Sequence, residues 1–284
     1  MSFFIAEVSS NHYRDLERCY AFIDAAAEAH CQAVKFQLFK IDQLFAPEIL
    51  KRSEAHRRRK GWELPVDFLQ QLACRCVENQ IQFSCTPFYL EAVGELEPYV
   101  DFYKIASYEL LWDDLLSACA RTRKPVILST GMATMPEIEH AVDVLRTSGC
   151  DNLTLLHCTS AYPTPYVEAN LSAIETIRKA TGCHVGWSDH TVDPGVIHRA
   201  IHRWGASAVE FHLDLDGKGE EYATGHCWLP DQISDVIRDV EHALGADGNG
   251  IKEPSPSELP DREWRADPLD GLRPFQAVRK HWEP

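Results

Sequence analysis

The stretch HVGWSDHTVDPGVIHRAIHRWGASAVEFHLD, residues 184–214, contains one complete structural unit. It begins with HVGWSDH (184–190), an apolar run rich in strand-forming residues, and ends with a second such run, AVEFHLD (208–214). Between them, DPGVIHRAIHRWG (193–205) has apolar residues at helical spacing. A strand, a helix and another strand in succession predict two parallel strands joined by a helical crossover.

The same unit recurs along the chain. Segments such as LERCYAFIDAAAEAH (16–30) and MPEIEHAVDVLRTSG (135–149) show helical spacing between further strand-like runs. Eight units predict a closed (β/α)8 TIM barrel, an α/β fold. The alternative is an open doubly wound sheet, which more often has fewer strands and a glycine-rich first turn. The six earlier runs are FFIAEV (3–8), AVKFQLF (33–39), IQFSCTP (81–87), DFYKIAS (101–107), PVILSTG (125–131) and LTLLHCT (153–159).

The length of 284 residues fits one barrel with a short extension. We expect the catalytic barrel to occupy residues 1–245, since the last strong helical pattern, DQISDVIRDVEHALG, ends there. Residues 246–284 begin with a loop-like stretch and are too few for an ordinary second domain. We expect them to form an irregular tail that packs on the barrel.

Composition excludes several classes of function. The formal net charge of −15 argues against nucleic-acid binding, which needs a basic surface. No apolar run approaches the roughly 20 residues that span a bilayer, so we expect no membrane association. The ten cysteines lack paired zinc-site or disulfide spacing and lie mostly in apolar runs, which predicts reduced thiols and a cytoplasmic protein without a signal peptide.

Polar residues gather where the predicted strands end, which is the active-site face of a parallel barrel. Lys35 and Lys104 lie inside apolar runs, where burial without a partner is costly, so we interpret them as anion or carbonyl ligands rather than surface lysines. His190 and His212 end consecutive strands and predict a metal pair, with hydrogen-bonded structural histidines as the alternative. Nitrogen and oxygen ligands suit Mn, Mg, Co or Zn equally. Hydroxyl residues recur at the same end of five strands: Thr86, Ser107, Ser129, Ser160 and Ser188.

These motifs together resemble the sialic acid synthase family, which includes N-acetylneuraminate synthase and its nonulosonate relatives. The resemblance covers roughly residues 3–245, and its longest segments are KPVILSTGMAT and LHCTSAYPTPY. It implies a (β/α)8 barrel that condenses phosphoenolpyruvate with a sugar aldehyde, using a divalent metal, to a 2-keto-3-deoxy sugar acid and phosphate. Family members are often dimers, but much of their contact involves a C-terminal domain that we do not expect here, so a homo-oligomer and a monomer both stay open. The other matching segments are IAEVSSNH, AVKFQLFK, FSCTPF, YKIASYE, VGWSDHT and VEFHLDLD.

The resemblance also implies roles for individual residues. His190 and His212 match the two metal-binding histidines of the family, whose metal activates the aldehyde. Glu7 matches an acidic residue near the metal-bound water and phosphoenolpyruvate. The positions that hold phosphoenolpyruvate in the family correspond to Lys35, Thr86, Lys104, Ser107, Ser129, Ser160 and Ser188, and those that contact the sugar correspond to Gln37, Glu109 and Tyr162.

Three departures from the family pattern concern the sugar. We expect the chain to lack the usual C-terminal antifreeze-like domain and its arginine, which Arg262, Arg265 or Arg273 could replace. The loop after the eighth strand reads GKGEEYATGHCWLP, without the usual proline-glycine-proline-acid motif. The basic run HRRRKGW (56–62) replaces a serine-containing loop after the second strand. We interpret this run as a solvated loop, with a lid or second phosphate contact as the alternative.

Other functions remain open at the level of sequence. A Schiff-base aldolase or lyase would use Lys104 or Lys35 as its nucleophile and need no metal. A two-histidine metal hydrolase fits less well, since no HxH pair follows the first strand. A non-catalytic ligand-binding barrel is the third alternative, and the combination of Lys35, Lys104, His190 and His212 argues against it.

Overall fold

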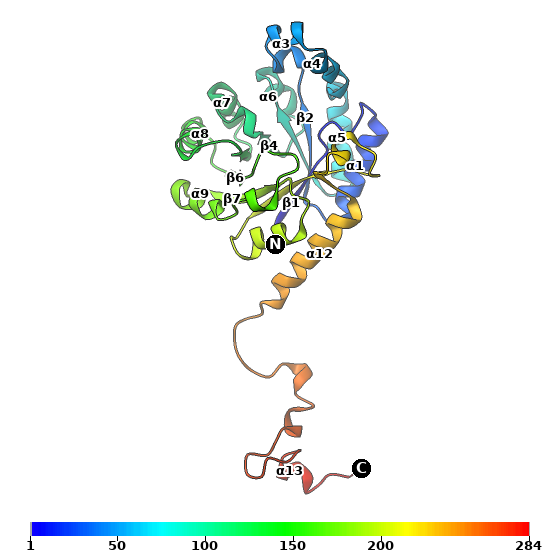
Figure 1. Ribbon diagram of the computed structural model, residues 1–284, viewed down its shortest axis with the longest axis vertical. Coiled ribbons are helices and arrows are strands. Elements are labelled where there is room, and N and C mark those ends of the chain that lie inside the picture. Colours follow the sequence, from blue (N-terminus) through cyan, green and yellow to red (C-terminus); the bar gives the residue numbers. More distant parts are fainter. Residues whose placement is uncertain (1, 284) are drawn as a thin grey trace. The chain divides into compact units, whose positions relative to one another are not determined.

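The computed structural model describes residues 2–283, and eight parallel strands in it close into a barrel (Figure 1). Each strand pairs with the next, and β1 (Phe3–Glu7) also pairs with β8 (Ala208–Leu213), which closes the ring. The predicted (β/α)8 barrel is therefore confirmed, and an open doubly wound sheet is excluded. The intervening strands are β2 (Ala33–Leu38), β3 (Gln82–Pro87), β4 (Phe102–Ile105), β5 (Val126–Ser129), β6 (Leu153–His157) and β7 (His184–Asp189).

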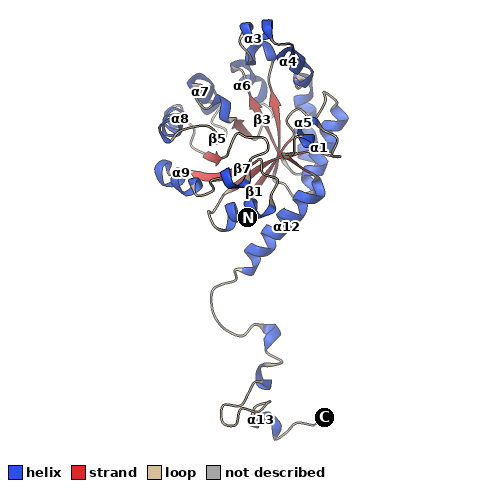
Figure 2. Cartoon of the chain, in the orientation of Figure 1, coloured by secondary structure: helices blue, strands red, loops and turns tan. Residues whose placement is uncertain are grey.

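Helices surround the barrel (Figure 2). The helices expected from their spacing are α1 (Leu16–Glu28), α8 (Met135–Thr147), α10 (Pro194–His202) and α12 (Pro230–Ala246). A two-residue strand that the sequence patterns do not predict, β9 (Cys227–Trp228), pairs with β8. The remaining helices are α2 (Ile41–Leu44), α3 (Pro47–Arg52), α4 (Glu54–Arg58), α5 (Leu69–Glu78), α6 (Leu90–Leu96), α7 (Asp113–Arg121), α9 (Ala173–Thr181), α11 (Glu220–Ala223) and α13 (Gln276–Arg279), with 3-10 turns at Arg59–Trp62, Val66–Phe68, Ser107–Glu109, Tyr166–Glu168, Pro256–Glu258 and Arg262–Trp264.

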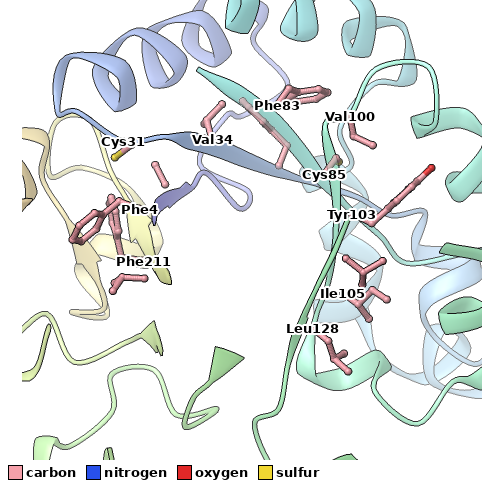
Figure 3. Packing of buried hydrophobic residues seen from close by; sticks show 14 of the residues in the cluster. Phe4, Cys31, Val34, Phe83, Cys85, Val100, Tyr103, Ile105, Leu128 and Phe211 are labelled. Atoms are coloured by element: carbon pink, nitrogen blue, oxygen red, sulfur yellow. The ribbon is translucent and has the colours of Figure 1, made fainter. Parts of the chain in front are cut away.

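Side chains alternate between two faces along every strand, because successive residues of a β-strand point in opposite directions. The outward set packs under the helices in the main apolar core, as Val34, Phe83 and Tyr103 do (Figure 3). The inward set begins with a smaller apolar cluster near the amino ends of the strands, made of Ile5, Ala33, Phe102, Ile127, Leu156 and Ala208. This cluster is called the barrel floor below.

Gly186 belongs to the inward set at the level of the barrel floor. A Cβ placed there would lie 2.3 Å from the carbonyl oxygen of Ala208 and 2.7 Å from Leu156. Only glycine lets β7 approach its neighbours so closely. The next inward residues of β7 are then Ser188 and His190, which the alternation places above the floor.

The chain divides into two compact units, one ending at Leu244 and one from Gly245 onward. Within the second unit, the side chain of Asp270 pairs with Arg279 at 2.6 Å, and Trp264 packs edge-on against Trp282. The packing of this tail on the barrel stays a prediction. Within residues 2–283, every helix falls short, in length or in apolar character, of what crossing a bilayer requires. The ten cysteines of the described chain are all unpaired, as expected for reduced thiols.

Candidate active site at the carboxyl ends of the strands

A cavity of about 790 Å³ opens at the carboxyl ends of the barrel strands. Its volume lies within the range of small-molecule sites. It is lined by all five residues predicted to be catalytic, namely Glu7, Lys35, Lys104, His190 and His212, and by six of the predicted substrate ligands, Gln37, Ser107, Glu109, Ser129, Tyr162 and Ser188. The remaining two, Thr86 and Ser160, do not line this cavity but lie directly behind residues that do.

Two lysines stand on the floor side of the cavity, each 3% exposed or less. Lys35 pairs with Glu7, and its Nζ lies 3.4 Å from the Thr86 hydroxyl. Lys104 donates to the Ser129 hydroxyl at 2.7 Å and to a backbone carbonyl at 3.1 Å, and lies 3.5 Å from Glu210. Burial lowers the pKa of Lys104, and the charge of Glu210 opposes this shift. The lysines are thus held in place by acceptors and face a common cavity.

Gly131 forms the bottom of a small polar niche after β5. A Cβ at this position would lie 2.2 Å from the Ser160 hydroxyl, 2.9 Å from the Ser107 hydroxyl and 3.0 Å from the Cys158 sulfur. The Gly131 N–H donates to the Ser107 hydroxyl at 3.0 Å, and the Ser160 hydroxyl has no partner in the described chain. Two hydroxyls and a backbone N–H therefore converge at one glycine, where only hydrogen fits.

The imidazoles of His190 and His212 face each other, with ring centroids 5.4 Å apart. Nδ1 of His190 lies 2.9 Å from the Thr159 carbonyl oxygen. Since a carbonyl oxygen only accepts, that nitrogen carries the hydrogen and Nε2 of His190 is left bare. Burial, with the neighbouring His212, lowers the pKa of His190 to about 3, which keeps the ring neutral.

His212 is oriented by a carboxylate. Its Nδ1 donates to Glu221 at 2.9 Å, which leaves Nε2 as the ligand atom of the neutral ring. Burial lowers the pKa of His212, but the hydrogen bond to Glu221 and the charge of this carboxylate outweigh burial and raise it. Glu221 also accepts from the hydroxyls of Ser9 at 2.6 Å and Ser10 at 3.0 Å.

The donor set fits a divalent cation. His212, Glu221, His226 and Cys227 bring potential ligand atoms within 4.8 Å of one another. Within this group, burial raises the pKa of the Cys227 thiol far above neutrality, so sulfur is a poor ligand here. The cavity wall also carries an excess of acid, since five carboxylates face three cations. A divalent cation would offset this excess where an anionic substrate has to bind.

Tyr162 covers the imidazoles. Its ring centroid lies 4.2 Å from that of His190, 5.8 Å from His212 and 5.1 Å from His226. The side chain is 42% exposed and lines the cavity, so it forms the wall between the histidines and solvent. The predicted contact of Tyr162 with a sugar stays a prediction.

Glu109 is a buried carboxyl on the cavity wall, in the 3-10 turn after β4. Burial raises its pKa to about 7, and its Oε2 has no hydrogen-bond partner within the described residues. Such a group exchanges a proton near neutral pH and has a free oxygen with which to do so.

The sequence patterns assign no individual role to several charged and aromatic residues of the cavity, among them Arg59, Trp62, Glu210, Glu221 and His226. Glu210 could have been found, because it shares the inward phase of β8 with His212. The basic run 56–62 is helical rather than a solvated loop, since α4 and the turn Arg59–Trp62 include most of it. Arg57 and Arg58 are exposed, as expected, whereas Arg59 and Trp62 line the cavity.

Known proteins resemble this chain in sequence and in fold. Residues 22–252 match the sequence profile of the NeuB family. The chain is 35% identical over 259 residues to an uncharacterized protein of Methanocaldococcus jannaschii, with 90% of this chain and 75% of that protein aligned. It is 34% identical to the N,N'-diacetyllegionaminic acid synthase of Campylobacter jejuni over 89% of this chain and 80% of that one. The N-acetylneuraminic acid synthetase of Leptospira borgpetersenii superposes with a TM-score of 0.81, at 32% identity over 93% of this chain and 91% of that structure.

Proposed function

Because the chain belongs to the NeuB family, as its resemblance to sialic acid synthases predicts, we propose that it condenses phosphoenolpyruvate with a sugar aldehyde. The products are a 2-keto-3-deoxy sugar acid of the nonulosonate type and inorganic phosphate. The relative from Campylobacter jejuni, a diacetyllegionaminic acid synthase, supports a product of this class. The observation that carries the proposal is the convergence of Lys35 and Lys104, both buried, with the histidine pair on one cavity.

Phosphoenolpyruvate binds at the bottom of the cavity, beside Lys35 and Lys104. Its carboxylate and phosphate need several positive or hydrogen-bonding groups in a site closed to water. Lys35, Lys104 and Ser129 offer such groups at the bottom of the cavity, and Ser188 adds a hydroxyl there. The niche at Gly131 offers the hydroxyls of Ser107 and Ser160 to phosphate oxygens. Held in this way, the enol carbon C3 points toward the cavity mouth.

The sugar aldehyde binds beside His190 and His212. Nε2 of His190 and Nε2 of His212 are the atoms that would hold a divalent ion, and the ion would supply Lewis-acid polarisation of a carbonyl oxygen. Their Nδ1 atoms are fixed by Thr159 and Glu221, so both rings keep the orientation that ligation requires. Mn, Mg, Co and Zn all remain compatible with this donor set.

Proton transfers fall to the carboxyl groups. When C3 attacks the aldehyde carbon, the aldehyde oxygen becomes a hydroxyl and needs a proton, which we assign to Oε2 of Glu109. Glu7, which also accepts from Gln37, orients the water that adds at C2. Glu7 accepts one proton of this water. The bond between C2 and the phosphate oxygen then breaks, the new hydroxyl becomes the C2 carbonyl, and its proton leaves with the phosphate. Gln37 and Tyr162, which both line the cavity, contact the sugar.

A phosphate-release assay tests the proposal. Full-length protein with added Mn²⁺ and phosphoenolpyruvate is offered N-acetyl hexosamines, other aldoses and their phosphates. Phosphate should appear only when an aldose and phosphoenolpyruvate are both present, together with a sugar acid of matching mass. Absence of release with every aldose and metal would overturn the proposal.

A Schiff-base aldolase is the second candidate, favoured by the burial that lowers the pKa of Lys104. Borohydride distinguishes the two. The proposed condensation forms no covalent enzyme adduct, so borohydride added with phosphoenolpyruvate or pyruvate should leave the mass of the protein unchanged. An adduct on Lys104 or Lys35 would favour the aldolase instead.

A further inference from the structure

The mouth of the cavity carries a cation that the proposed chemistry does not use. Arg59 lies in the 3-10 turn Arg59–Trp62, beyond β2, and lines the cavity together with Trp62 and Phe45. Its guanidinium carbon lies 5.3 Å from the ring centroid of Trp62 and 5.5 Å from that of Phe45. Two aromatic rings therefore support the guanidinium without using up its N–H donors.

Arg59 differs from the other cations of the cavity in having no counter-charge. Lys35 pairs with Glu7, and Lys104 lies beside Glu210. On the same short helical segment, Arg58 pairs with Glu54, whereas Arg59 has no carboxylate partner within residues 2–283. An arginine that is held by aromatic rings and left unpaired is available to bind an anion.

The segment that carries Arg59 is anchored to the barrel at two points. The Arg14 guanidinium, from the loop after β1, donates to the carbonyl oxygen of Lys60 at 3.2 Å. The Glu63 carboxylate accepts from the backbone N–H of Ile41 at 2.9 Å. The segment is thus held at two points directly after Arg59, which reduces the entropy lost when Arg59 binds a ligand.

The position of Arg59 indicates which substrate it meets. Phosphoenolpyruvate fills the bottom of the cavity, where both lysines are buried, whereas Arg59 is exposed at the mouth. The sugar has to place its aldehyde near the histidines and extend its other end outward. We propose that Arg59 binds an anionic group, a phosphate ester or a carboxylate, at the end of the sugar remote from the aldehyde. This inference rests on the proposed condensation.

The test compares three sugars that share one aldehyde end: N-acetylmannosamine, its 6-phosphate and the corresponding uronate. Phosphate release is measured with wild-type protein, Arg59→Gln and Lys60→Gln. Lys60 is the matched control, because it carries the same charge on the neighbouring position, has no carboxylate partner within the described residues and does not line the cavity. Arg59→Lys shows whether a positive charge without the guanidinium geometry is enough to bind the anionic sugar.

We expect wild-type protein to have a higher kcat/KM for one of the anionic sugars than for the neutral one. In Arg59→Gln, kcat/KM for the anionic sugar divided by kcat/KM for the neutral sugar should fall about 10- to 100-fold, because the charged hydrogen bonds of the guanidinium are lost. This ratio should be unchanged in Lys60→Gln. Whichever anionic sugar, the 6-phosphate or the uronate, loses more kcat/KM in Arg59→Gln carries the anionic group that Arg59 binds.

Three results would overturn the inference: a preference for the neutral sugar, an equal loss for all three sugars, or a rise confined to the KM of phosphoenolpyruvate. If none of these sugars supports phosphate release, titration calorimetry measures the affinity of each variant for mannose 6-phosphate without turnover. Weaker binding to Arg59→Gln than to Lys60→Gln then supports the anion site, and equal binding contradicts it. Failure of the condensation and failure of the anion site are therefore distinguishable.

Discussion

The carboxylate of Glu221 accepts a hydrogen bond from Nδ1 of His212 at 2.9 Å, although Glu221 lies outside the barrel strands. It comes from the short helix α11 after β8 and also binds Ser9, 212 positions away in the chain. A carboxylate in this position fixes the tautomer of a histidine ligand and makes Nε2 more basic. Glu221 would therefore act on the proposed metal site through His212.

Replacing Glu221 by Ala should weaken Mn²⁺ binding about 10- to 100-fold, because His212 loses the partner that fixes its ring. Titration calorimetry with Mn²⁺ measures the change independently of turnover. Glu220→Ala is the control, since Glu220 also lines the cavity but makes no bond to an imidazole of the described chain. Equal Mn²⁺ affinity of the two variants would contradict this role of Glu221.

His190→Ala should remove bound metal and phosphate release together while leaving the barrel folded. His190 directly follows β7, and its ring makes one hydrogen bond, to a backbone carbonyl, so its loss leaves the pairing of the barrel strands intact. Metal content by mass spectrometry, circular dichroism and the phosphate assay are measured on one preparation. A fully chelated wild-type protein should behave in the same way, and turnover without metal would refute the metal role.

Gly131→Ala should raise the KM for phosphoenolpyruvate by about 10-fold or more, because its methyl group would occupy the niche shared by Ser107 and Ser160. Gly94→Ala is the control. Gly94 lies within α6 with no atom within 4 Å of its added methyl group, so this change should raise stability by about 0.5–1 kcal/mol. Thermal unfolding separates a folded Gly131→Ala variant from an unstable one. An unchanged KM would show that the niche does not hold the substrate.

Glu109 should make the free energy of unfolding depend on pH. Burial raises its pKa in the folded protein to about 7, from an ordinary value of 4.5. The folded state therefore keeps a proton that the unfolded chain loses, so the contribution of Glu109 to stability falls as pH rises from about 4.5 to about 7 and is constant above that. Glu109→Gln should remove this loss, which is on the order of 3 kcal/mol.

Urea unfolding of wild type and Glu109→Gln at pH 5 and pH 8 measures this difference. The variant should gain stability relative to wild type at pH 8 and much less at pH 5. Glu139→Gln controls for the loss of an exposed carboxylate, since Glu139 is exposed on α8 and its side chain has no hydrogen bond or ion pair within the described residues. An equal offset at both pH values would contradict a raised pKa of Glu109.

Much of the fold and of the site follows from strand alternation. In each strand run, the residues in phase with the lysines and histidines point into the barrel, as Lys35, Ser188 and Glu210 do. Asp189 and His157 have the opposite phase and lie outside the cavity. Asp189 accepts from the indoles of Trp187 at 3.1 Å and Trp228 at 3.0 Å, so it fixes the end of β7 rather than orienting His190.

The residues that could not be predicted come from outside this periodicity. Glu221, in the short helix α11, and His226, between α11 and β9, both lie beyond β8, and their position depends on closure of the barrel between β8 and β1. Arg59 reaches the cavity through the short helices α3 and α4, whose course depends on distant contacts such as that of Arg14 with Lys60. No local pattern indicates which arginine of a basic run turns inward.

The barrel floor has a kinetic consequence. Its six apolar side chains lie in the barrel below the lysines, so the cavity is closed toward the amino ends of the strands. The first substrate to enter must be the one that binds deepest, and a sugar already at the mouth would obstruct it. Initial-rate analysis should therefore show compulsory-order kinetics, with phosphoenolpyruvate leading. The sugar should inhibit at high concentration by trapping enzyme that has not yet taken up its partner.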